Sequence, residues 1–116
     1  MRRIVLKEPG EFAVEEASVP EPGAGEALVR IRRVGVCGSD LHLFRQGRLG
    51  GREAGSSHVM GHECTGRVEQ VGPDADKELE GKRVSVEPAI PCGECRWCRT
   101  GLYNVCPHGD FIGVPP

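Results

Sequence analysis

The chain has no long apolar run and no excess of one charge. The apolar stretch that opens it, Ile4–Leu6, is too short for a signal peptide, and nothing later approaches the length of a membrane span. Its 15 basic and 17 acidic residues give a net charge of −2 and are interleaved, so neither a basic stripe for nucleic acid nor a long acidic tail is present. We therefore expect a cytoplasmic protein with no membrane or nucleic-acid partner.

Long helical patterns are also scarce. The 17 glycines and 9 prolines favour short strands joined by tight turns, and one domain accounts for 116 residues. A single helical turn is expected over 39–44, with Ser39 or Asp40 as N-cap. Residues alternate between apolar and polar, as in half-buried strands, over 26–36, 65–71 and 83–87, and a further strand is expected over 11–19. The sequence thus predicts a mainly β fold, a barrel or a sandwich.

Four cysteines lie within fifteen residues near the end of the chain. Cys92, Cys95, Cys98 and Cys106 follow a C-x2-C-x2-C-x7-C spacing, which lets four thiolates converge on one ion. A closed all-thiolate site is typical of structural Zn²⁺. An iron–sulfur cluster is an alternative, although ferredoxin runs have x3 before the last cysteine. Disulfides are another, but they need an oxidising compartment. We interpret the segment as a structural zinc lobe.

A second group of metal-ligating residue types comes from two separated segments. Cys37 is followed by Ser39, Asp40 and His42, and a Gly-His-Glu run ends in His62 and Glu63. Three protein ligands leave one position for water or substrate, as in catalytic zinc sites. The alternatives are that the cysteine is a small buried apolar residue and that the His-Glu pair lies on the surface. Spacing alone leaves these interpretations open.

The two groups together resemble the zinc-containing alcohol dehydrogenases of the medium-chain family, whose N-terminal catalytic domain is a GroES-like barrel. The resemblance rests on the four-cysteine lobe, VGVCGSDLH over 34–42 and GHE over 61–63. VEPAIPCGEC and GLYNVC are most similar to the polyol branch of sorbitol (L-iditol) and xylitol dehydrogenases, with threonine and glucose dehydrogenases as near relatives. The resemblance implies that residues 1–116 are the N-terminal part of the GroES-like domain, with the zinc lobe at about 88–110.

The resemblance implies specific metal ligands. Cys37 and His62 would hold a catalytic zinc, and Glu63 would be the third ligand, as in polyol dehydrogenases. Asp40 would accept a hydrogen bond from the other ring nitrogen of His62 and fix its tautomer. The zinc would lower the pKa of a bound alcohol, and the hydride would pass to NAD(P) in the full-length enzyme, which is expected to be a homo-oligomer.

Further roles concern the proton and the substrate. Ser39 would take the hydroxyl proton and His42 would pass it to solvent. Phe111 matches an apolar position of the substrate pocket, whereas Leu43 stands where polyol dehydrogenases commonly carry a tyrosine. No G-x-G-x-x-G fingerprint follows a strand, so we expect no dinucleotide-binding domain within these residues. The alternative function is a stand-alone, zinc-stabilised binding or assembly module without catalysis.

Overall fold

A computed structural model describes residues 1–55 and 57–115. Its first sheet has the order β2-β1-β6 and is built from β1 (Arg2–Glu8), β2 (Glu11–Glu16) and β6 (His58–Val59). Val5 and Leu6 lie in the central strand β1 and are buried. The expected strand over 11–19 is confirmed as the shorter β2. Strand β1 was missed, because its apolar residues are consecutive and show no clear alternation.

The second sheet carries the three alternating segments that the sequence predicts. It has the order β3-β7-β8, all antiparallel, with bounds Ala27–Val34, Cys64–Val71 and Arg83–Ser85. On β7, Gly66 and Val68 are buried on one face, while Thr65, Arg67 and Glu69 are exposed on the other. A Cβ atom on Gly66 would lie 2.4 Å from the Arg30 carbonyl oxygen, so only glycine fits where β3 and β7 approach.

Helix α1 (Gly38–Gln46) begins one residue after Cys37, which is its N-cap. The N-cap expected at Ser39 or Asp40 is therefore wrong. Asp40 is the third residue of the helix, and its side chain accepts a hydrogen bond from the Cys37 backbone N–H at 2.8 Å. The Cys37 side chain in turn faces the backbone N–H of Asp40, so the two residues form a capping box. The helix ends at Gly47 with a φ of 67°, a conformation that glycine adopts without strain.

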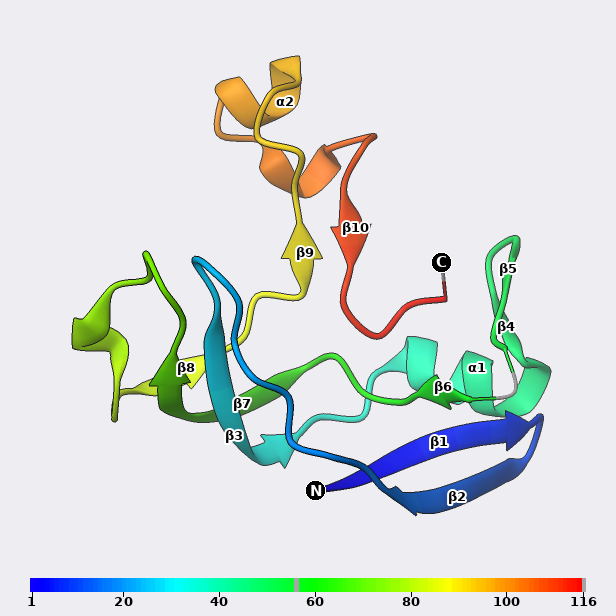
Figure 1. Cartoon of the computed structure of the whole chain (residues 1–116). Coiled ribbons are helices and arrows are strands. Elements are labelled where there is room, and N and C mark those ends of the chain that lie inside the picture. The colour runs from blue at the N-terminus through cyan, green and yellow to red at the C-terminus, as the bar shows by residue number, and fades with distance from the viewer. Residues whose placement is uncertain (56, 116) are drawn as a thin grey trace.

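The cysteine segment projects from the rest of the molecule on a two-stranded stalk (Figure 1). The stalk pairs β9 (Ala89–Ile90) with β10 (Asp110–Phe111), and between them lie α2 (Arg96–Arg99) and the 3-10 turn η2 (Tyr103–Val105). After β10 the chain returns towards α1 and the hairpin formed by β4 (Arg48–Leu49) and β5 (Arg52–Glu53). A second 3-10 turn, η1 (Lys77–Leu79), joins β7 to β8. The stalk thus brings Phe111 back beside the residues that follow β3.

The apolar core is small. The molecule measures 41 × 36 × 20 Å, and its buried hydrophobic residues in the described chain include Val5, Leu6, Leu43 and Val68. Leu43 is fully buried, so the side chain at this position faces the interior. Many apolar side chains stay exposed, among them Ile4, Phe12, Val14, Val36 and Trp97. In the described residues, no helix is both long enough and apolar enough to span a membrane.

Candidate metal centres

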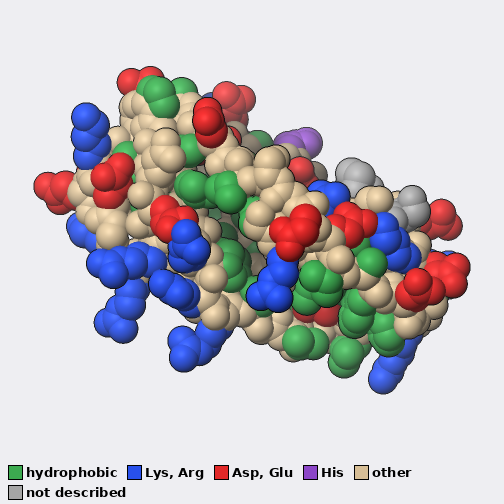
Figure 2. All heavy atoms as spheres, turned by 60° about the horizontal axis from the view of Figure 1, so that its bottom comes forward, with side chains coloured by type: hydrophobic (Ala, Val, Ile, Leu, Met, Phe, Trp, Pro, Cys, Tyr) green, Lys and Arg blue, Asp and Glu red, His purple; other side chains and the backbone are tan. Residues whose placement is uncertain are grey.

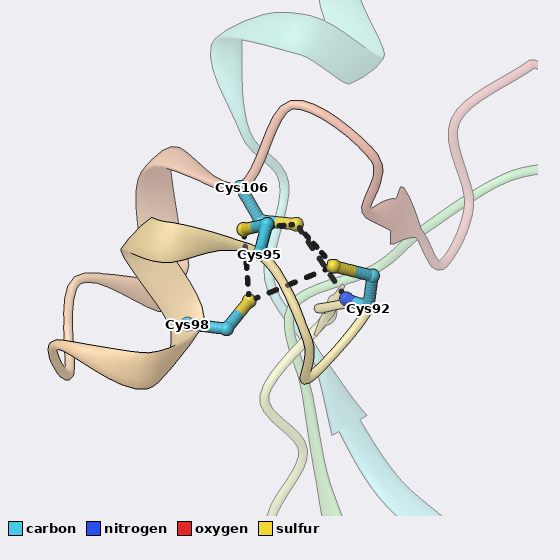
Figure 3. A group of neighbouring side chains, drawn as sticks. All are labelled: Cys92, Cys95, Cys98 and Cys106. Atoms are coloured by element: carbon cyan, nitrogen blue, oxygen red, sulfur yellow. Dashed lines mark hydrogen bonds between the residues drawn. The ribbon is translucent and has the colours of Figure 1, made fainter.

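The structure brings the four cysteines of the lobe together (Figure 3). Cys92 follows β9, Cys95 is the N-cap of α2, Cys98 lies within α2, and Cys106 caps the end of η2. Between the first two, Gly93 turns the chain at a φ of 76°. The sulfur-to-sulfur distances are 3.5 Å for Cys92–Cys106 and Cys95–Cys98, 3.8 Å for Cys95–Cys106 and 3.9 Å for Cys92–Cys98.

These distances fit a tetrahedral zinc site. Four sulfurs held at about 2.3 Å from a central zinc lie about 3.8 Å apart in a regular tetrahedron. The observed edges of 3.5–3.9 Å bracket this value, and they are far longer than a disulfide bond of about 2.05 Å. All six cysteines are free thiols. Cys106 lies within reach of the other three sulfurs, so the neighbouring His108 is not needed as a ligand.

Hydrogen bonds at the lobe favour thiolates at two of its cysteines. The backbone N–H of Cys92 donates to the Cys106 sulfur at 3.5 Å and is the main reason why the pKa of Cys106 falls to about 6. Backbone N–H groups of Glu94 and Cys95 lower the pKa of Cys92. Loss of hydration, together with the neighbouring sulfurs, raises the pKa of Cys98 to about 12. A divalent cation would stabilise all four groups as thiolates at once.

The second group also converges. One ligand atom each of Cys37, His62 and Glu63 lies within 4.8 Å of the others. Cys37 is placed by the start of α1, while His62 and Glu63 immediately precede β7. The backbone N–H of Gly35 donates to the Glu63 carbonyl oxygen at 2.7 Å and fastens the two segments to each other. A thiol, an imidazole and a carboxylate form a donor set that suits Zn²⁺.

The buried side chains around His62 support this assignment. His62 and Asp40 are only 4% and 7% exposed, and their Nδ1 and Oδ1 atoms lie 3.6 Å apart, too far for a hydrogen bond. In the described residues both atoms lack a hydrogen-bond partner. Such a pair is costly when unsatisfied. A metal held by Nε2 would leave the ring proton on Nδ1, the atom that faces the Asp40 carboxylate. The Ser39 hydroxyl lies 3.4 Å from Nε2, the ring nitrogen that would face an ion.

A hollow of about 480 Å³ opens beside the three ligands. The Phe111 ring meets the His62 ring edge-on, with centroids 5.6 Å apart. His42 is exposed and does not line the hollow, so it stands apart from the residues that the structure gathers. The lining comprises Cys37, Ser39, His62, Glu63 and Phe111, together with Leu49, Pro88 and Val114, which sequence reasoning did not single out. Leu49 lies in the two-residue strand β4, Pro88 in an irregular segment and Val114 in a bend, and no periodic pattern marks stretches this short.

The segment 113–115, whose Val114 lines the hollow, is held by two side chains from elsewhere. The His58 ring nitrogen Nε2 lies 3.1 Å from the Gly113 carbonyl oxygen, and the Arg52 guanidinium donates to the Pro115 carbonyl oxygen at 3.2 Å. Gly113 packs so closely on Gly61 and His62 that a Cβ atom would lie 2.8 Å from the Gly61 carbonyl oxygen. The end of the described chain is thus fixed against His62.

Comparison with known proteins identifies the family. The model of the alcohol dehydrogenase GroES-like domain matches residues 23–114. Sorbitol dehydrogenase of Bacillus subtilis is 39% identical over 116 residues, which cover 100% of this chain and 33% of that protein.

Solved structures agree with this. A crystal structure of an Escherichia coli oxidoreductase/dehydrogenase of unknown specificity matches with a TM-score of 0.89 and 39% identity over 99% of this chain and 33% of that one. The cobalt- and zinc-bound thermostable alcohol dehydrogenase of Pyrobaculum aerophilum matches with a TM-score of 0.85 and 31% identity over 99% of this chain and 35% of that one. The chain spans about a third of the length of these relatives. The expected GroES-like fold is confirmed, and the chain belongs to the family of alcohol dehydrogenase GroES-like domains.

Proposed function

We propose that this chain is the zinc-binding part of the catalytic domain of an NAD(P)-dependent polyol dehydrogenase, with a structural zinc in the lobe and a catalytic zinc at Cys37, His62 and Glu63. The observation that carries the proposal is the convergence of these three ligand atoms within 4.8 Å at the edge of a hollow. A lobe zinc alone would stabilise a binding module and would not require this second group.

The chain's own residues would prepare the substrate hydroxyl. A zinc ion bound there would act as a Lewis acid that makes an alcohol more acidic. Asp40, by accepting from Nδ1–H, would hold His62 in the tautomer whose Nε2 lone pair faces the ion. Ser39, with its Oγ 3.4 Å from Nε2, would accept the hydroxyl proton. Ser39 would at the same time release its own hydroxyl proton, and His42 would pass a proton to solvent from the exposed side of α1.

The substrate we propose is a small polyol with a secondary hydroxyl, oxidised to a ketone. The 39% identity to sorbitol dehydrogenase supports this class, and Phe111, Leu49 and Val114 give the hollow an apolar part beside the polar ligands. The acceptor of the hydride would be NAD(P), bound by a part of the protein outside these residues. We further propose a cytoplasmic homo-oligomer as the working form.

The test uses the complete polypeptide that carries these residues, assayed for cofactor reduction with sorbitol. Substitution of Ser39 by Ala should lower kcat by roughly 10²-fold or more while the metal content stays unchanged, since a positioned proton acceptor contributes about 10²–10⁴-fold. His108→Ala, at an exposed histidine outside both ligand groups, is the matched control and should keep full activity. Unaltered kcat in Ser39→Ala would refute the proton-acceptor role. A fully metal-loaded wild-type polypeptide without dehydrogenase activity would favour the binding module.

A further inference from the structure

The outer face of the second sheet carries a row of three opposed arginines. In the register of the sheet, Arg67 on β7 stands directly opposite Arg30 on β3 and Arg83 on β8. Directly opposite residues of antiparallel strands share a face with Cβ atoms about 5 Å apart, and like charges in such positions are destabilising. All three side chains are exposed. Three positive charges in one row repel one another, and a bound anion would offset this repulsion.

The next row of the same face adds hydrogen-bond donors. Thr65 on β7 stands opposite Arg33 on β3 and Ser85 on β8, two residues along from Arg67 and hence on the same side. A β-bulge between Ile31 and Arg33 leaves Arg32 unpaired at the edge of this row. We call the combined surface the arginine face; it consists of Arg30, Arg32, Arg33, Thr65, Arg67, Arg83 and Ser85. Figure 2 shows Lys and Arg side chains gathered at the end of the molecule that carries β3, β7 and β8.

Acidic side chains neutralise only part of this face. In the described chain, the ion pair that involves it joins Arg30 to Glu69. Arg67 uses its Nε–H to reach the Gly81 carbonyl oxygen at 2.6 Å, which leaves its terminal N–H groups free to point elsewhere. A hollow of about 600 Å³ lies over the face, lined by Arg32, Arg33, Arg67 and Arg83, by the hydroxyl residues Thr65 and Ser85, and by Gly66 and Val84. Four arginines and two hydroxyl residues thus line one hollow.

We infer that the arginine face binds the phosphate group of a small molecule. Guanidinium forks match the oxygens of a phosphate in a bidentate manner, and Thr and Ser hydroxyls add short donors. A space of this size suits a small ligand. A protein partner would need a desolvated apolar or aromatic anchor at the centre, and Val84 is the one larger apolar residue among those that line the hollow. Single-stranded nucleic acid would need aromatic side chains for stacking, and the lining contains none.

The inference is independent of the proposed catalytic function, because none of the arginine face's residues belongs to the candidate zinc ligands. It can be tested by two-dimensional NMR of the 116-residue chain titrated with inorganic phosphate, with glucose 6-phosphate and with glucose, each at matched ionic strength. Both phosphate compounds should shift the amide signals of Arg33, Thr65 and Ser85, and glucose should not. Tighter binding of glucose 6-phosphate than of inorganic phosphate would identify a phosphate ester as the ligand, and the reverse order would identify the free ion.

The matched variants remove equal charge. The double variant Arg33→Gln/Arg83→Gln should weaken phosphate binding at least tenfold and, without phosphate, should be no less stable to heat than the wild type, because charge repulsion is relieved. Arg2→Gln/Arg45→Gln, at two exposed arginines outside the face, should leave the affinity within a factor of two.

Three results would overturn the inference. The first is a set of shifts that sodium chloride reproduces or that persists in the double variant. The second is tighter binding of an oligo-glutamate peptide or an oligothymidylate than of glucose 6-phosphate, which would assign the face to a macromolecule. The third is loss of phosphate binding in the complete polypeptide, which would mean that the protein's own residues cover the face.

Discussion

Asp40 faces His62 across 3.6 Å in the interior, with both side chains at most a tenth exposed. The same carboxylate performs a second task, because its other oxygen accepts the Cys37 backbone N–H at 2.8 Å. One side chain thus connects a helix start, a cysteine and a histidine that are candidates for the same metal. The position of Asp40 links the stability of α1 to the geometry of the ligands.

These two tasks can be separated by substitution. Asp40→Asn retains an oxygen for the Cys37 N–H but presents an amide N–H to Nδ1, so it should keep the fold and weaken zinc binding at the second site by about 10–100-fold. Asp40→Ala should in addition lower the free energy of unfolding by roughly 1 kcal/mol through loss of the cap. Zinc titration and thermal denaturation of both variants measure the two effects. Equal zinc affinity in wild type and Asp40→Asn would contradict the role assigned to Asp40.

The lobe should depend on each of its four sulfurs. Cys98→Ser should abolish the tighter of two zinc sites and expose the lobe to proteolysis, because structural zinc binding contributes directly to folding free energy. Cys64→Ala is the matched control, since this half-buried cysteine lies outside both ligand groups and should keep both metals. Metal analysis and limited proteolysis report on both variants. A Cys98→Ser protein that keeps its lobe metal and its protease resistance would show that four thiolates do not form the site.

The acid stability of the first sheet should depend on Glu15. Hydrogen bonds from Lys7 and then from Arg3 hold the pKa of Glu15 below its ordinary value of 4.5, so the folded state favours the charged carboxylate. The stability that the charged Glu15 contributes is fully present above pH 4.5. It is lost as the pH falls through the lowered pKa that Glu15 has in the folded state. Glu15→Gln should therefore lower the thermal midpoint at pH 7 and match the wild type near pH 2. Glu16→Gln, one residue along and 79% exposed, should change little at either pH. A constant difference across this range would contradict the assignment.

The proposed substrate class predicts how kcat/KM should differ between polyols and ethanol. In the complete polypeptide, kcat/KM for sorbitol or xylitol should exceed that for ethanol, since the second carbon chain and further hydroxyls of a polyol add contacts that ethanol lacks. Leu43 stands where polyol dehydrogenases commonly carry a tyrosine, and its full burial places this side chain in the core. Comparable values for ethanol and the polyols, measured by cofactor reduction, would move the protein to the general alcohol dehydrogenases.

The features that could be predicted from the sequence depend on the spacing of residues close together in the chain. The C-x2-C-x2-C run places its sulfurs through a few backbone angles, so the lobe could be predicted from sequence, and the alternations of β3 and β7 identified the second sheet. The capping of α1 was predicted at the wrong residue because Asp40 can serve either as N-cap or from the third helical position. The arginine face escaped notice because Arg30, Arg67 and Arg83 meet only through the register of three strands. Leu49 lies in the two-residue strand β4 and Val114 in a bend, and stretches this short show no periodicity that would place them at the hollow.

The count of zinc ions per chain tests the central claim most directly. Native mass spectrometry of the protein purified without chelator should show two zinc ions in the wild type and one in His62→Ala, with the remaining ion resistant to a chelator that removes the other from the wild type. His108→Ala should retain both. One zinc in the wild type and the same single zinc in His62→Ala would show that Cys37, His62 and Glu63 do not hold a metal, and the proposed catalytic centre would be wrong.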